Sequence, residues 1–157
     1  MRFRDKVFSG LIFLKYIALR RGTPIAARVN LTYQCPRRCR YCNLWKDPPK
    51  EMSTDEVFSL IDQLSDMGCK MLSFSGGEPL LRDDIGEIID HASGAGLSTS
   101  INNSGVLFSR RAKDISGVGL VEFSLDGTRK SNDYNLSLIH ISEPTRPLYI
   151  SYAVFCL

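Results

Sequence analysis

Apolar and polar side chains follow two different spacings along the chain, and these spacings alternate. Residues 27–33 (ARVNLTY) alternate apolar and polar positions and contain β-branched and aromatic residues, which is typical of a strand. Further along, Ser53 is followed three residues later by Glu56, and apolar residues then recur at helical spacing as far as Gly68. Glycine is a common residue directly after a helix. The pattern therefore predicts a strand and then a helix of about four turns.

The same order of elements occurs twice more and is followed by a fourth strand. Strands are predicted at 71–75, 97–101 and 120–125, and helices at 84–95 and 109–115. Such alternation indicates parallel strands joined by right-handed crossovers, so the predicted fold class is α/β. In parallel sheets, ligands bind at the carboxyl ends of the strands. The polar, glycine-rich stretches that follow the strands should therefore lie together at one edge.

Residues 1–24 precede the first strand and contain an apolar stretch, residues 7–19, interrupted by Lys15. This stretch is too short to span a bilayer, and no small-residue cleavage site of a signal peptide follows it. Its apolar residues fit one face of a helix. We interpret residues 1–24 as a helical extension packed on the protein, in preference to a helix lying on a membrane surface.

Residues 136–157 (LSLIHISEPTRPLYISYAVFCL) do not continue the pattern. A helix should follow the fourth strand, but Pro144 and Pro147 exclude one there. Segments 136–146 and 150–157 resemble, in the correct order, the two fixed parts of a translated sequencing-library adapter. We interpret residues 136–157 as a non-native tail; the alternative is a natural apolar strand at the C-terminus.

Composition adds little until the cysteines are considered. The hydrophobic fraction is 43%, the charged fraction 24% and the net charge +3, values of an ordinary soluble protein that do not indicate nucleic acid or a membrane as partner. Three of the five cysteines, Cys35, Cys39 and Cys42, fall within eight residues. Disulfide frameworks rarely crowd cysteines in this way. We therefore expect a reducing, cytoplasmic location and a ligand role for these thiols.

Three thiolates on one short loop can converge on a metal centre. Structural zinc sites and four-iron clusters both take four ligands, and only three are local here. Cys69 follows a helix at the opposite end of a predicted strand, so we expect a buried apolar residue rather than the fourth ligand. A four-iron cluster held by three cysteines leaves one iron open. That iron could chelate the amino and carboxylate groups of an amino-acid-like ligand.

The basic and aromatic residues around these cysteines allow more than one interpretation. Arg37, Arg38 and Arg40 could contact phosphates, but balancing an anionic cluster, or simple solvation, is the preferred interpretation. Trp45 could shield a cluster from water or could serve ordinary packing.

The motif Cys35-x3-Cys39-x2-Cys42, with Tyr41 before the last cysteine, resembles the signature of the radical S-adenosylmethionine (SAM) superfamily. The resemblance extends over about residues 28–133 and includes Gly76-Gly77-Glu78-Pro79 after the second strand. It implies a truncated, partial (β/α)6 TIM-like barrel with about four parallel strands present. Residues 25–135 would then be part of the core domain, placed between the helical extension and the tail.

The resemblance also implies an enzymatic function. The three cysteines would hold a 4Fe-4S cluster, and the cluster would cleave SAM reductively to give a 5′-deoxyadenosyl radical. The arrangement of motifs is most similar to the subgroup that modifies peptides or builds cofactors. No side chain is assigned a catalytic role. The residues implied in binding SAM are Tyr41, Gly76, Gly77, Glu78, Pro79, Asn103, Ser124 and Asp126.

Expected partners are a reductant such as flavodoxin or ferredoxin and an unidentified substrate, either a peptide or a small molecule. Nucleic acid and a membrane span are not expected. Two alternatives remain: an iron–sulfur or zinc module that binds metal or transfers electrons without SAM chemistry, and an inactive truncated product. We expect the 157-residue chain alone to be poorly stable and inactive, because its fourth strand would be left unpaired.

Overall fold

The structure is a computed structural model that describes residues 24–46, 48–125, 127–128, 132, 135–136 and 152–156, the last range by its backbone alone. The helix predicted within residues 7–19 lies outside these residues. Among the helices of the described part, none is long and apolar enough to cross a membrane. The elements in chain order are β1 (Ala26–Thr32), α2 (Thr54–Asp66), β2 (Met71–Gly76), the short 3-10 helix η1 (Pro79–Leu81), α3 (Ile85–Gly94), β3 (Ser98–Asn103), α4 (Phe108–Arg111), β4 (Leu120–Ser124) and β5 (Tyr152–Cys156).

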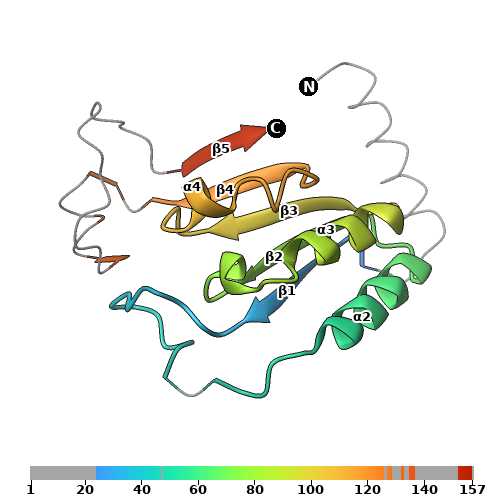
Figure 1. The fold of residues 1–157 in the computed structure, drawn as a ribbon, viewed down its shortest axis with the longest axis horizontal. Helices are drawn as coiled ribbons and strands as arrows, with labels where there is room; N and C mark the ends of the chain where they lie inside the picture. Colours follow the sequence, from blue (N-terminus) through green and yellow to red (C-terminus); the bar gives the residue numbers. More distant parts are fainter. Residues whose placement is uncertain are drawn as a thin grey trace.

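The strands form one sheet in the order β1-β2-β3-β4-β5, visible in Figure 1. The first four strands are parallel to their neighbours, which confirms the α/β class and the four predicted parallel strands. Helix α4 covers only four residues, so the prediction of a helix over 109–115 was too long. Strand β3 extends through Asn103, two residues beyond the predicted end at residue 101.

The expectation of an unpaired fourth strand was wrong. Strand β5 pairs with β4 antiparallel, from Leu120 opposite Cys156 to Ser124 opposite Tyr152. An edge strand presents a row of unsatisfied backbone N–H and C=O groups, and a short segment of β-forming residues can satisfy them. The sequence YAVFC of β5 is such a segment.

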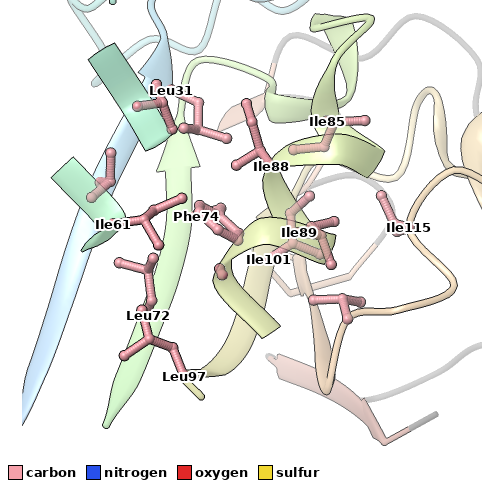
Figure 2. Packing of buried hydrophobic residues seen from close by; sticks show 14 of the residues in the cluster. Leu31, Ile61, Leu72, Phe74, Ile85, Ile88, Ile89, Leu97, Ile101 and Ile115 are labelled. Atoms are coloured by element: carbon pink, nitrogen blue, oxygen red, sulfur yellow. The ribbon is translucent and has the colours of Figure 1, made fainter. Parts of the chain in front are cut away.

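The apolar core lies between the sheet and the helices α2 and α3, and Figure 2 shows its packing. Phe74 of β2 is fully buried, between Ile61 of α2 and Ile89 of α3. The predicted capping box of α2 is present, because the Glu56 N–H donates to Ser53 Oγ at 3.2 Å and the Ser53 N–H donates to Glu56 Oε2 at 2.8 Å. This layer holds β1, β2 and β3 in parallel, with their carboxyl ends at one edge.

Cys69 is confirmed as a buried residue away from that edge. Its side chain is 1% exposed, and its thiol donates to the carbonyl oxygen of Met71 at 3.3 Å. The thiol belongs to the amino end of β2, whereas Cys35, Cys39 and Cys42 follow the carboxyl end of β1. Cys69 is therefore not placed to act as a fourth ligand.

Candidate functional site

A cavity of about 170 Å³ lies at the carboxyl edge of the parallel strands. The segment between β1 and Pro48, residues 33–46, forms one wall and is called the cysteine loop below. The ends of β2, β3 and β4 form the opposite wall. The residues lining the cavity are Cys35, Arg37, Cys39, Tyr41, Cys42, Leu44, Trp45, Ser75, Gly76, Gly77, Asn102, Asn103, Ser104, Ser124 and Leu136. The structure thus brings together the three cysteines and most of the predicted ligand-binding residues.

Two glycines let the end of β2 lie directly against the start of the cysteine loop. The N–H of Gly77 donates to the carbonyl oxygen of Thr32 at 2.7 Å, and the N–H of Glu78 donates to that of Gln34 at 2.8 Å. A Cβ atom on Gly77 would clash with the Gln34 carbonyl, and one on Gly76 would clash with that of Thr32. Gly76 also has a φ of +123°, which favours glycine. The glycines therefore set how close the loop lies to the sheet.

Glu78 is directed into the protein rather than into the cavity. Its side chain is fully buried, and Oε1 accepts the Leu80 N–H at 3.3 Å. Oε2 accepts the backbone N–H of Ser104 at 2.9 Å and also the Ser104 hydroxyl. Pro79, also buried, begins η1. Neither Glu78 nor Pro79 lines the cavity, so of the four-residue motif the two glycines form the cavity wall.

The ends of β3 and β4 supply amide and hydroxyl groups. Asn103 is buried, and its side chain donates to the Glu122 carbonyl at 3.1 Å and accepts the Gly105 N–H at 2.8 Å. The Ser124 hydroxyl donates to Asn102 Oδ1 at 3.1 Å. Both Asn103 and Ser124 line the cavity, as predicted for ligand-binding residues, but Asp126 lies outside the described residues.

The three cysteines of the loop are half-buried and free of disulfides. Burial raises the pKa of the Cys35 thiol. The backbone N–H of Arg37 donates to the Cys35 sulfur at 3.4 Å and lowers this pKa, but the effect of burial is larger. Burial also raises the pKa of Cys39. Both thiols therefore keep their protons near neutral pH, and a metal that binds them must displace those protons.

The described residues contain no group of three His, Cys, Asp or Glu side chains close enough to share one metal ion. A single tetrahedral zinc, with Zn–S bonds of about 2.3 Å, would require such convergence. A four-iron cluster does not, because each cysteine binds a different iron. Three half-buried thiols that line one cavity supply the kind of donor set that a cluster of several irons uses.

Sequence reasoning gave little weight to Arg37 and overlooked Ser104. Arg37 is buried, at 6% exposure, and its Nη2 donates to the carbonyl oxygen of Ser104. Ser104 continues the polar run of Asn102 and Asn103, and that run was the available signal. Tyr41 lines the cavity but is 64% exposed. Trp45 lines the cavity and lies under the Arg38 guanidinium, 4.7 Å from the ring centroid.

The protein has a parallel β/α sheet with a three-cysteine loop at its carboxyl edge. Comparison of the sequence with protein families identifies the class of protein to which this arrangement belongs. The model of the radical SAM superfamily matches residues 29–142. The chain belongs to the radical SAM superfamily.

Individual relatives agree with this membership. The chain is 36% identical over 115 residues to the PqqA peptide cyclase of Bradyrhizobium diazoefficiens, a match that covers 69% of this chain and 30% of that protein. The chain thus spans about a third of its relative's length.

Solved structures show the same fold. Streptococcus suis SuiB bound to S-adenosylmethionine superposes with a TM-score of 0.65 at 17% identity, over 80% of this chain and 31% of SuiB. SuiB bound to its precursor peptide SuiA gives a TM-score of 0.64 at 16% identity, over 80% of this chain and 30% of SuiB. These likenesses support the partial TIM-like barrel.

Proposed function

We propose that this chain is the cluster- and SAM-binding part of a radical SAM enzyme. The observation that carries the proposal is the position of Cys35, Cys39 and Cys42 around one cavity whose opposite wall begins at Gly76 and Gly77. When bound, a 4Fe-4S cluster would supply the electron that breaks a carbon–sulfur bond of SAM and gives methionine and a 5′-deoxyadenosyl radical. Cys35, Cys39 and Cys42 would hold it and leave one iron for the amino and carboxylate groups of SAM.

The polar walls of the cavity would orient SAM. The tight contact between β2 and the loop places the backbone of Gly76 and Gly77 at the wall, where carbonyl oxygens can accept hydrogen bonds from an ammonium group. Asn103 and Ser124 offer polar groups from the neighbouring strands. Tyr41 is the exposed aromatic side chain at the mouth and would contact the adenine. Glu78 and Pro79 would contribute to SAM binding by positioning the backbone of the cavity wall rather than by contact with SAM. Asp126 is proposed to contact SAM.

A peptide is the substrate class that the relatives favour. One relative is a peptide cyclase, and SuiB was solved with a precursor peptide. Because this chain spans only part of such proteins, peptide modification is proposed for the whole protein of which it would form a part. A cytoplasmic reductant such as flavodoxin or ferredoxin would supply the electron.

The boundary at residue 135 is also a proposal. We propose that residues 136–157 are a non-native tail, on the strength of their resemblance to a translated adapter. Leu136 is buried and its carbonyl accepts the Cys39 thiol at 3.7 Å, next to Asn135, whose carbonyl accepts the Arg40 N–H at 3.2 Å. Sequencing of a contiguous genomic clone tests the proposal, and a clone that encodes residues 136–157 would refute it.

The proposed chemistry is tested by anaerobic reconstitution of the chain with iron and sulfide. The chain should take up about four irons, absorb in the visible, and change its EPR signal when SAM is added. Cys39→Ala should lose the complete cluster, whereas Cys69→Ala, at a buried thiol away from the cavity, is the matched control and should retain it. A cluster that ignores SAM would instead indicate an electron-transfer module.

A further inference from the structure

The guanidinium of Arg37 is buried with most of its hydrogen-bonding capacity unused. Nη2 donates to the Ser104 carbonyl, but Nε and Nη1 have no partner within the part of the chain that the structure describes. Buried polar groups in folded proteins are almost always hydrogen-bonded, and a buried charge without a partner is costly. Two donors of the Arg37 guanidinium therefore lack the hydrogen-bond acceptor that a buried charged group normally has.

The other partly buried arginine near this edge shows how such a group is usually satisfied. Arg82 directs Nε and Nη2 to the carboxylate of Asp84 at 2.8 and 2.6 Å. Its Nη1 donates to the carbonyl oxygens of Leu31 and Met52 at 3.0 and 2.8 Å. All three nitrogens of Arg82 are thus used, so the unused donors of Arg37 distinguish it from Arg82.

No carboxylate among the described residues is bonded to Arg37. Glu78 is the carboxylate whose charge acts on Arg37. Its two carboxylate oxygens already accept from Leu80 and Ser104. The other titratable groups that act on the guanidinium are the sulfur atoms of Cys39 and Cys35 and the Tyr41 hydroxyl, and all three residues line the cavity with Arg37. Its own backbone N–H already points at the Cys35 sulfur.

We propose that the two unused donors of Arg37 bind the anionic sulfur of an iron–sulfur cluster held by Cys35 and Cys39. This inference rests on the proposed function and adds a charged group that contacts the cluster. A fixed positive charge beside a cluster stabilises the reduced form, which carries one more negative charge, and so raises the reduction potential. Arg37 would therefore both complete the cavity wall and tune the potential at which the electron is accepted.

Two other roles would leave different traces. Arg37 could be only a structural link between the cysteine loop and the β3 end, through Ser104. It could also bind the carboxylate of SAM in the same cavity. A structural link would mainly alter stability, and a carboxylate site would mainly alter SAM affinity. In both cases the guanidinium would not contact the cluster, so the potential measured without SAM would change less than with direct contact.

The test is an EPR-monitored redox titration of the reconstituted chain without SAM. Arg37→Gln removes the charge and should shift the midpoint potential to a more negative value. Arg37→Lys keeps the charge and should stay close to the unmodified chain. Arg38→Gln is the matched control, because it removes the same charge from the exposed side of the same loop, where solvent screens it. Its shift should be clearly smaller.

Iron content, thermal unfolding and SAM affinity are measured on the same samples. An unchanged potential in Arg37→Gln, or a shift no larger than that of Arg38→Gln, would overturn the inference, as would a loss of SAM affinity alone. If Arg37→Gln takes up no cluster, the potential of Arg37→Lys is the deciding measurement. A potential near that of the unmodified chain supports the inference, and a potential far below that of the unmodified chain refutes the inference. Failure of the unmodified chain to form any cluster would refute the proposed function, and the inference with it.

Discussion

Glu78 and Ser104 are 26 residues apart in sequence, yet one carboxylate oxygen of Glu78 accepts both the backbone N–H and the hydroxyl of Ser104. Glu78 follows β2 and Ser104 follows β3. The contact therefore joins the carboxyl ends of two neighbouring strands directly behind the cavity wall. It also fixes the Ser104 carbonyl that Arg37 uses, so the cysteine loop is linked to the same point.

Replacing Glu78 by glutamine should destabilise the protein. The amide nitrogen of glutamine would face N–H or O–H donors in place of a carboxylate oxygen, and hydrogen bonds to a charged acceptor are the stronger ones. We expect a loss of about 1–3 kcal/mol in the free energy of unfolding, measured by urea denaturation. Glu87→Gln changes an exposed glutamate on α3 and should cost far less. Equal losses in the two variants would contradict the role given to Glu78.

Gly77→Ala tests how closely β2 must lie against the cysteine loop. Its Cβ would clash with the Gln34 carbonyl, so the strand end and the loop must move apart. We expect a loss of about 1–3 kcal/mol in stability and reduced iron uptake on reconstitution. Gly94→Ala is the control, because a Cβ on that helical glycine meets nothing within 4 Å. It should stabilise the chain by up to about 1 kcal/mol. Normal iron uptake by Gly77→Ala would show that the close contact is not needed.

Asp84 should make the stability sensitive to acid. The hydrogen bonds from Arg82 are the main reason that the pKa of Asp84 lies below its usual value, and Thr54 adds a further one at 2.6 Å. Because the folded pKa is lowered, the stabilisation is complete above the usual aspartate pKa of about 3.9 and is lost as the pH falls through the folded value. Asp84→Asn should therefore lower stability at pH 7 and flatten the decline of stability below pH 4.

The neighbouring Asp83 provides the control for that titration. Its side chain is fully exposed and pairs with Arg111 at 3.2 Å, a kind of contact that usually contributes little. Asp83→Asn should leave both the stability at pH 7 and the acid profile nearly unchanged. An acid profile of Asp84→Asn that matches the unmodified chain would show that Asp84 does not carry this dependence.

Deletion of residues 137–157 tests the proposed non-native tail. It removes β5, which exposes the edge of β4, but keeps Leu136 in contact with Cys39. We expect unchanged iron uptake and more self-association in sedimentation experiments, because an open strand edge can pair with another copy. Loss of iron uptake on deletion would indicate that the tail is part of the site.

The fold followed from the sequence wherever local signals were strong. The capping box at Ser53 and Glu56, the glycine after α2, and the alternation in ARVNLT each predicted an element that the structure contains. The strand–helix order then placed the cysteines and Gly76-Gly77 at one edge. Weak signals failed: β5 was discounted because its segment resembled an adapter, and α4 was overextended because residues 112–115 are apolar or charged without a clear stop.

The position of the candidate residues at one edge of the sheet was predictable, but the orientation of their side chains was not. Spacing identified Cys35, Cys39 and Cys42, but no local pattern indicates that Glu78 is directed inward to Ser104. Likewise, a loop arginine is usually exposed, and the burial of Arg37 depends on contacts with residues about 70 positions away. Such long-range contacts, formed only when the strands assemble, decide which polar side chains reach the cavity.

Mössbauer spectroscopy of the chain reconstituted with ⁵⁷Fe, before and after addition of SAM, tests the central claim most directly. The account predicts a four-iron cluster in which one iron differs from the other three and changes its signal when SAM binds. A cluster whose four irons are equivalent and indifferent to SAM, or a chain that binds zinc in place of iron, would contradict it.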